Sequence, residues 1–409
     1  MSNRNAAIKI IKLLSRNGFQ ALLAGGCVRD MLLHRPARDY DVATSAHPED
    51  VMKLFKRTLK VGAKFGVVIV LLEDKQVEVA TFRTEAGYAD GRHPTTVRFA
   101  TAAEDSSRRD FTINGMFYDP LEKKVIDYVD GQADLKKQII RTIGEPSERF
   151  GEDYLRMLRA VRFSAQLGFA IEPKTWAAIC HNAKYIVGIS GERKCMELED
   201  IFIDTNRCTG VSLLADSGLA EAIFPALSAE QIKLAIKVLH ELPRRIDFPL
   251  ALAGFFAGCD TKFALEKCQI LKLSRSQTKH LKFLLTNRGK LLNKDMSLAE
   301  LKMALAEPYF WDLYNLQKAI QKAAIGGNKS FEQLIVLKSR IEALGDIELK
   351  PRPLLNGHDL MRLGSVSGPR LGQLAQEMYI AQLEGKLQTT EQAEQWAKKW
   401  LESRKVVEQ

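Results

Sequence analysis

The chain has 409 residues, of which 46% are hydrophobic and 27% charged, and its formal net charge at pH 7 is +10. A chain of this length is expected to form about two to four packed units, and its apolar content excludes an intrinsically disordered protein. The longest apolar run, residues 248–259, is far shorter than the roughly 20 residues that cross a bilayer, which argues against a membrane partner. Six cysteines without a CxxC pair indicate neither a zinc ribbon nor a disulfide framework and suit a cytoplasmic protein.

The first third of the chain contains short β-type runs separated by polar or glycine-bearing turns. A basic amphipathic helix precedes them and is expected to pack beside the first strand, and from about residue 138 the pattern becomes helical. These patterns predict an α+β head followed by an extended all-helical remainder. Strands are predicted at residues 21–23, 39–43, 67–72, 77–82 and 97–99.

The pair Gly25 and Gly26 stands between a predicted strand and a predicted helix that carries Arg29. The backbone N–H groups of such a turn can approach a phosphate, and the helix N-terminus adds positive potential. A tight structural turn is the alternative, because no Walker-type lysine follows the glycines.

Two carboxylates, Asp39 and Asp41, occupy alternate positions of a β-type run and are therefore expected on the same face of a strand. Two aligned carboxylates beside a phosphate-binding turn fit a pair of Mg²⁺ ions that assist phosphoryl transfer. Glu78, between two valines, is a third candidate, because a charge in an apolar strand is costly unless it is paired or binds a metal. The alternatives are a solvated strand end for the aspartates and an exposed edge-strand face for Glu78.

The segment 108–114, with the sequence RRDFTIN, suits a nucleoside triphosphate. Arg109 offers a forked donor to phosphate, and Asp110 and Asn114 can bond a ribose hydroxyl. A surface salt-bridge cluster is the alternative.

Asp153 and Arg156 are three residues apart in a helical pattern, which places an acceptor and a forked donor on one helix face. Cytosine and adenine both present an amino donor beside a ring-nitrogen acceptor, whereas uracil and guanine reverse both polarities and would leave buried groups unpaired. The pair can therefore accept C and A without a nucleic-acid template, while Arg159 and Arg162 continue at three-residue steps toward the triphosphate. An intrahelical ion pair on a solvated face is the alternative.

A basic run without acidic residues extends from position 267 to position 294. Such a run can follow an RNA backbone and give affinity without reading sequence, although an ordinary solvated face has the same composition. The candidate RNA-binding residues are Lys267, Lys272, Arg275, Lys279, Lys282 and Arg288.

The motifs GGCVRD at 25–30, DYD at 39–41, RRDFTIN at 108–114 and EDYLRMLRAVRF at 152–163, with a weaker GERKCMEL at 191–198, occur in this order. They resemble the nucleotidyltransferase superfamily of tRNA CCA-adding enzymes and bacterial poly(A) polymerases, most specifically the bacterial (class II) tRNA nucleotidyltransferases. The resemblance implies a polymerase-β-like head with a small mixed sheet (1–138), a helical neck that selects the base (139–205), and a helical body (206–325) and tail (326–409) that bind RNA. It also implies that C, C and A are added to the 3′ end of tRNA from CTP and ATP, with two Mg²⁺ as cofactors, release of pyrophosphate and no DNA partner.

Two positions depart from the family pattern: His34 stands where glycine is common, and Gly115 where a small alanine is usual. The segment 83–94 is polar and glycine-bearing, as expected for the mobile loop of members that add all of CCA. A poly(A) polymerase, a partial enzyme adding only CC or only A, and a non-catalytic RNA-binding protein stay open as alternatives, as does the oligomeric state.

Overall fold

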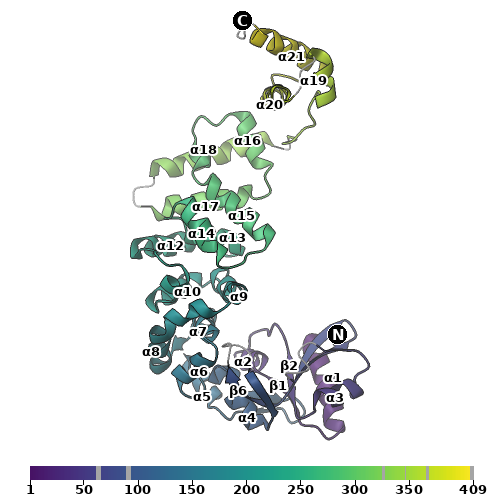
Figure 1. The fold of residues 1–409 in the computed structure, drawn as a ribbon, viewed down its shortest axis with the longest axis vertical. Coiled ribbons are helices and arrows are strands. Elements are labelled where there is room, and N and C mark those ends of the chain that lie inside the picture. Colours follow the sequence, from purple (N-terminus) through teal and green to yellow (C-terminus); the bar gives the residue numbers. More distant parts are fainter. Residues whose placement is uncertain (61–65, 89–93, 325–327, 346, 365–367, 406–409) are drawn as a thin grey trace. The chain divides into compact units, whose positions relative to one another are not determined.

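The computed structural model describes residues 1–60, 66–88, 94–324, 328–345, 347–364 and 368–405 (Figure 1). The chain divides into two compact units, Met1–Ile232 with Glu266–Leu273, and Lys233–Leu265 with Ser274–Gln409. The predicted division at residues 138, 205 and 325 is finer than these two units and stays a prediction. Within the described ranges, no helix combines the length and the hydropathy that a membrane crossing requires.

The first unit is built on a sheet of strands β1 (Ala21–Ala24), β2 (Asp41–Thr44), β3 (Thr58–Leu59), β4 (Val67–Leu72), β5 (Lys75–Thr81), β8 (Phe117–Asp119) and β9 (Lys124–Ile126). Their order is β3-β4-β5-β2-β1-β8-β9. Strands β2 and β5 run parallel, with Val42 opposite Val79, while the other neighbours are antiparallel. The predicted α+β head with a mixed sheet is confirmed.

Helix α1 (Asn3–Arg16) covers this sheet with its apolar face and contacts β1, β2 and β5. Ile10, Ile11 and Leu14 are fully buried there, which confirms the amphipathic helix expected beside the first strand. Helix α3 (Pro48–Leu54) lies beside α1 (Figure 1).

Two strand predictions need correction. Strand β2 begins only at Asp41, so Asp39 precedes the strand instead of belonging to it. The segment 83–94, predicted as a loop, begins with strand β6 (Arg83–Tyr88), which pairs antiparallel with β7 (Pro94–Phe99). A polar composition does not prevent such a hairpin, because its ladder is made by backbone groups. Residues 89–93 lie outside the described residues.

Both departures from the family pattern have a local structural account. His34 has a φ of 54°, in the left-handed region where a Cβ is crowded and glycine is favoured. A Cβ on Gly115 would lie 2.6 Å from Val129 Cγ2 and 2.9 Å from Ile143 Cδ1, so an alanine would not fit unless these neighbours shifted.

The helical part of the first unit is organised around α7 (Leu155–Leu167), which contacts α9 (Gly191–Phe202) and α10 (Arg207–Asp216). Met157, Leu158 and Val161 of α7 are fully buried. The other elements are α2 (Gly26–Leu32), α4 (Ala102–Ser107), η2 (Thr112–Asn114), α5 (Gly131–Lys137), β10 (Ile139–Ile140), α6 (Pro146–Glu152), β11 (Ala170–Ile171), α8 (Pro173–Asn182), η3 (Ala183–Gly188) and α11 (Leu219–Ile223).

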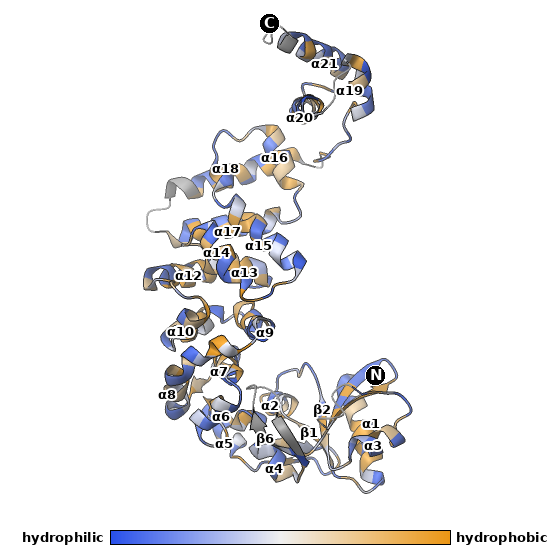
Figure 2. Cartoon of the chain, in the orientation of Figure 1, coloured by the Kyte–Doolittle hydropathy of each residue, from blue (hydrophilic) through white to orange (hydrophobic). Residues whose placement is uncertain are grey.

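In the second unit, helix α13 (Phe248–Phe255) is buried along its whole length and packs against α15 (Arg275–Asn287) and α17 (Phe310–Ala323). Most other helices of this unit show both hydrophilic and hydrophobic stretches (Figure 2), as expected of helices with one buried face. A separate core around Leu360, Leu374 and Trp400 joins α19 (Gly357–Gly364), α20 (Pro369–Leu383) and α21 (Thr390–Lys405). The remaining helices of this unit are η4 (Lys290–Leu292), α16 (Leu298–Leu305) and α18 (Asn328–Leu344), while the residues of α12 (Ala229–Glu241) and α14 (Thr261–Gln269) are divided between the two units.

Candidate active site

A polar cavity of about 470 Å³ lies in the first unit, where the sheet meets α7 and α9. It brings together most of the residues predicted for nucleotide binding, although they come from distant parts of the chain. Asp39, Glu78 and Arg162 are not among the lining residues. The residues that do line the cavity are Gly25, Gly26, Arg29, Asp41, Arg108, Arg109, Asp110, Asn114, Asp153, Leu155, Arg156, Arg159, Phe163 and Arg193.

The glycine turn is shaped by Arg109. Gly25 has a φ of 74°, which favours glycine, and a Cβ there would lie 3.0 Å from Arg109 Nη1. Asp105, which is almost fully buried, holds Arg109 through its Oδ2, at 3.0 Å from Arg109 Nη2, and it pairs with Arg108 as well. Burial alone would raise the pKa of Asp105, but the two arginines outweigh it and lower that pKa. The RRDFTIN motif contains both arginines but not Asp105, which precedes them by one helical turn. The motif alone therefore does not reveal the role of Asp105.

Asp41 lines the edge of the cavity, with the carboxylates of Glu78 and Asp39 nearby. Glu78 precedes Val79, which pairs with Val42 in the parallel register, so Glu78 lies beside Asp41 on the neighbouring strand. Asp41 is exposed at the start of β2, yet desolvation by the groups around it, together with the negative charges of Glu78 and Asp39, raises its pKa to about 6, while Arg109 opposes this shift. Mutually repelling carboxylates of this kind fit a divalent cation with oxygen ligands. Among the described residues, their ligand atoms do not form a group of three within 4.8 Å, so metal binding by Asp39 and Asp41, with Glu78 as a third candidate, stays a prediction.

Asp110 is held by three hydrogen bonds and one further ion-pair contact, which together use the roughly four acceptor positions of a carboxylate. Its Oδ1 accepts from the Phe111 N–H at 2.8 Å and from Asn114 Nδ2 at 3.2 Å, and its Oδ2 lies 2.8 Å from Arg159 Nε and 2.6 Å from Arg159 Nη2. Burial would raise its pKa, but Arg159 and these hydrogen bonds hold it at about 2. Asp110 is therefore occupied in fixing Asn114 and Arg159, while Asn114 Oδ1 accepts from Arg29 Nη1 at 2.8 Å and keeps capacity for a hydroxyl.

Asp153 does not share a helix with Arg156, contrary to the prediction. Helix α6 ends at Glu152, and Asp153 has extended dihedral angles, φ −156° and ψ 103°, just before α7 begins at Leu155. Both side chains nevertheless line the cavity. Asp153 forms a two-pronged ion pair with Arg193 of α9, with Nη1–Oδ1 and Nη2–Oδ2 distances of 3.1 and 2.6 Å. Arg193 belongs to the weak GERKCMEL motif, but the sequence contained no signal that its partner lies 40 residues away.

Arg156 is directed by the end of α6. Its Nη1 donates to the Glu152 carboxylate and, at 2.8 Å, to the Arg149 carbonyl. Its Nε and Nη2 have no partner among the described residues, so a forked donor side is available to the cavity. Arg149 in turn bonds the carbonyls of Ser107 and Arg109, which ties α6 to the triphosphate motif.

The prediction that Arg162 reaches the triphosphate is wrong. Its Nη1 lies 2.7 Å from Asp200 Oδ2 and its Nε 3.1 Å from Glu197 Oε2, so it joins α7 to α9 away from the cavity. Three-residue steps along a helix rotate successive side chains around the axis, and this rotation carries Arg162 past the cavity.

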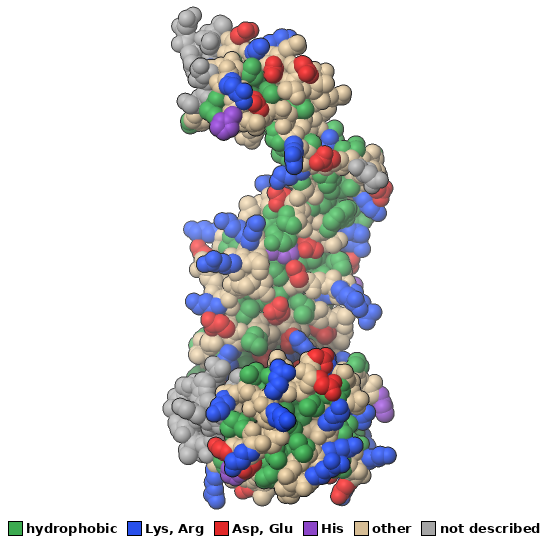
Figure 3. All heavy atoms as spheres, turned by 90° about the vertical axis from the view of Figure 1, so that its right-hand side faces the viewer, with side chains coloured by type: hydrophobic (Ala, Val, Ile, Leu, Met, Phe, Trp, Pro, Cys, Tyr) green, Lys and Arg blue, Asp and Glu red, His purple; other side chains and the backbone are tan. Residues whose placement is uncertain are grey.

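The candidate RNA-binding residues are divided between the two units. Lys267 and Lys272 belong to the first unit and the others to the second. Arg275, Lys279 and Lys282 are exposed on one face of α15 and stay candidates. On the face drawn in Figure 3, Lys and Arg side chains are spread among acidic and apolar ones and do not form a single patch.

The RNA-binding prediction needs correction at Arg288. This half-buried guanidinium donates to the carbonyls of Phe256, Ala257 and Cys259 at 2.9, 2.8 and 2.6 Å. These carbonyls follow the C-terminus of α13, where such groups lack helical partners. Arg288 therefore closes a helix end and is not directed at a phosphate backbone.

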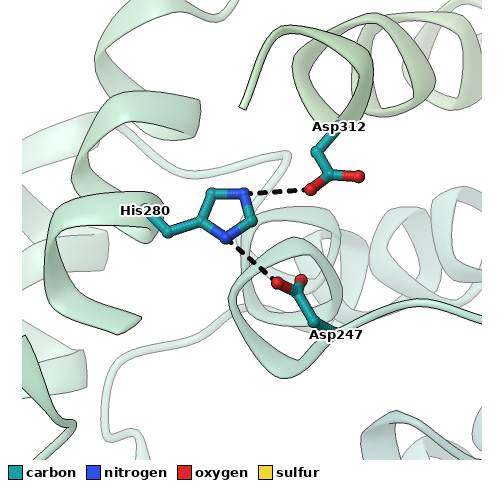
Figure 4. A group of neighbouring side chains, drawn as sticks. All are labelled: Asp247, His280 and Asp312. Atoms are coloured by element: carbon teal, nitrogen blue, oxygen red, sulfur yellow. Dashed lines mark ion pairs between the residues drawn. The ribbon is translucent and has the colours of Figure 1, made fainter. Parts of the chain in front are cut away.

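One further cluster, which we call the His280 clamp, consists of Asp247, His280 and Asp312 in the second unit (Figure 4). His280 Nδ1 lies 3.0 Å from Asp247 Oδ2 and Nε2 lies 3.2 Å from Asp312 Oδ2. Burial would lower the pKa of His280, but the two carboxylates outweigh it and raise that pKa to about 9. A charged imidazolium with a carboxylate at each nitrogen has no lone pair for a metal. The clamp therefore ties α15 to the start of α13 and to α17.

The mixed sheet and the glycine turn beside it define a nucleotidyltransferase head of the poly(A) polymerase type. A family model described as "Poly A polymerase head domain" matches residues 21–141, and one described as "Probable RNA and SrmB- binding site of polymerase A" matches residues 168–231.

Comparison with whole proteins narrows this class. A CCA-adding enzyme of Lactobacillus johnsonii is 34% identical over 396 residues, which cover 95% of each chain. One of Lacticaseibacillus paracasei is 36% identical over 373 residues, which cover 90% of this chain and 89% of that one. The chain belongs to the CCA-adding enzyme family. The crystal structure of the Bacillus stearothermophilus CCA-adding enzyme in complex with CTP superimposes with a TM-score of 0.82 over 99% of both chains, at 29% identity.

Proposed function

We propose that this protein adds C, C and A to the 3′ end of tRNA, using CTP and ATP and releasing pyrophosphate. The observation that carries the proposal is the pairing of an acceptor, Asp153, with the open donor side of Arg156 in one cavity. This polarity complements the amino group and ring nitrogen that cytosine and adenine share. No nucleic-acid template is needed, because the protein itself supplies the complementary edge.

In the reaction, the 3′-hydroxyl oxygen of the tRNA forms a bond with the α-phosphorus, and the bond from that phosphorus to the pyrophosphate oxygen breaks. Two Mg²⁺ ions, held by Asp39 and Asp41 with Glu78 beside them, would favour loss of the hydroxyl proton and neutralise the leaving pyrophosphate. The Gly25–Gly26 turn and Arg109 bind the triphosphate. Asn114, held by Asp110 and Arg29, is positioned to bond the ribose.

The activity is tested with tRNA that lacks its last three nucleotides, incubated with labelled CTP, ATP or both, and product length is read on a gel. We expect two additions with CTP alone and three with both nucleotides. Many additions from ATP alone would indicate a poly(A) polymerase, and a stop after CC a partial enzyme. Extension only of tRNA that already ends in CC would indicate an A-adding enzyme, and a gel shift without turnover in Mg²⁺ a non-catalytic RNA-binding protein.

The cytoplasmic location expected from the cysteines, which are all free thiols, stays a prediction.

A further inference from the structure

We propose that Arg193 is a positioning residue for base selection, which sets the direction of the one acceptor position that Asp153 offers to an incoming base. The inference rests on the proposed function, because it concerns the same cavity. Arg193 and Asp153 come from different elements, α9 and the segment between α6 and α7, and both line the cavity. Their side chains are 20% and 17% exposed, so the ion pair is largely shielded from water.

The hydrogen bonds of Asp153 leave little freedom to its carboxylate. Oδ1 accepts from the Leu155 N–H at 3.1 Å and from Arg193 Nη1 at 3.1 Å, while Oδ2 accepts from Arg193 Nη2 at 2.6 Å. Since a carboxylate has about four acceptor positions, the bonds made by the described residues leave one position on Oδ2 open. A planar guanidinium that binds both oxygens fixes the carboxylate plane and thus the direction of that position.

A fixed acceptor discriminates more strongly than a mobile one. The amino group of cytosine or adenine can donate to Oδ2, whereas uracil and guanine would present a carbonyl oxygen and repel it. A carboxylate free to rotate could turn away from that carbonyl and reduce the penalty. The forked guanidinium of Arg193 prevents this rotation of the carboxylate. Loss of Arg193 is therefore expected to weaken rejection of UTP more than it weakens catalysis.

Arg193 is itself anchored from outside the cavity. Its N–H donates to the Ser190 side chain at 3.4 Å at the start of α9. A Cβ on Gly191 would lie 2.0 Å from the Ile270 carbonyl oxygen, so the helix start packs directly against the backbone of another segment of the same unit. This contact fixes the position from which the guanidinium reaches Asp153.

The test compares full-length Arg193→Lys and Arg193→Gln with the unmodified protein. The readout is the ratio of kcat/KM for CTP to kcat/KM for UTP on tRNA that lacks its last three nucleotides. Lysine keeps the charge but not the fork, so we expect both variants to lower the ratio by about tenfold or more, with a higher KM for CTP. Methylguanidinium added to Arg193→Ala should restore part of the ratio. This rescue tests the same role of the guanidinium if the lysine or glutamine variant is unstable.

Arg141→Lys is the matched control. It disrupts an Arg–Asp ion pair of the same unit, with Arg141 Nε 3.0 Å from Asp134 Oδ2, whose members do not line the cavity, and it should leave the ratio unchanged. Failure of the unmodified protein to extend tRNA, or an unaltered ratio in Asp153→Ala, would contradict the proposed function. A lowered ratio in Asp153→Ala, with an unaltered ratio in both Arg193 variants and no rescue by methylguanidinium, would overturn the inference alone.

Discussion

Two clusters of ion pairs join helices in this chain, one around the cavity of the first unit and the other in the His280 clamp of the second. In the clamp, each ring nitrogen of His280 already faces a carboxylate. In the cavity, Asp153 keeps an acceptor position on Oδ2, and Arg156 keeps donors on Nε and Nη2. The charges are similar, but both ring nitrogens of the clamp are turned to its own carboxylates, whereas the cavity cluster keeps a donor side as well as an acceptor position for a ligand. An available donor beside an available acceptor, more than density of charge, distinguishes this binding site from the clamp.

The largest expected effect is on turnover. Asp41→Asn should reduce nucleotide transfer by about a thousandfold or more, because it removes a charge that the metal ions require. Thermal stability should stay equal or rise, because the substitution relieves repulsion from Glu78 and Asp39. Transfer assays and melting curves measure the two effects, and retained tRNA binding in a gel shift is the control. Turnover close to that of the unmodified protein would contradict the assignment.

The second effect is on stability. His280→Gln should lower the free energy of unfolding by about 2–3 kcal/mol at pH 7, because it leaves Asp247 and Asp312 without their charged partner. Transfer chemistry in the first unit should be unchanged at temperatures where the chain is folded. His240→Gln is the control, since His240 is exposed and, within the described part of the chain, pairs only with Glu241. Equal melting temperatures for the two variants would show that the clamp contributes nothing.

The clamp also predicts a pH dependence. The pKa of His280 in the folded chain, about 9, lies above its ordinary value of 6.5. The stabilisation is therefore fully present below pH 6.5 and is lost as the pH rises through about 9. The difference in melting temperature between the unmodified protein and His280→Gln should shrink between pH 6.5 and pH 10. A difference that stays constant over this range would exclude a charged His280.

A smaller effect is expected at Gly115. Gly115→Ala should cost about 1–3 kcal/mol, because its Cβ would overlap Val129 and Ile143. Gly372→Ala, in a helix where nothing lies within 4 Å of the new Cβ, should instead stabilise the chain by up to about 1 kcal/mol. Denaturant unfolding measures both changes. A stabilising Gly115→Ala would mean that the neighbours yield without cost.

The smallest effect is expected at His34. His34→Gly should raise the stability by about 1 kcal/mol or less, because glycine adopts the left-handed conformation without steric cost. His34→Ala keeps the strain and removes only the imidazole, so it separates the two contributions. An equal change in both variants, measured by thermal melting, would attribute the effect to the side chain.

The sequence predicted well what depends on local pattern. The strands at residues 21–24, predicted as 21–23, and 67–72 follow from their apolar runs, and the glycine turn follows from Gly25 and Gly26. It could not predict contacts between distant segments, such as Arg193 with Asp153 or Arg288 with the end of α13. The break between α6 and α7 was also missed, because a helical period continues through Asp153 although its backbone is extended. Local periodicity does not reveal the tertiary contacts that decide which charged side chains form ion pairs and which are available to a ligand.

The path of the chain has a practical consequence for dissecting this protein. Residues Glu266–Leu273 belong to the first unit although they follow a segment of the second, and Ile270 packs against Gly191 at the start of α9. A fragment that stops at Ile232 would keep every motif of the cavity but lose the backbone that supports Arg193. Such a fragment is expected to discriminate between nucleotides less well than the whole chain, even where it still transfers them. Residues that support nucleotide selection therefore lie after Ile232, beyond the point at which a catalytic fragment would be cut.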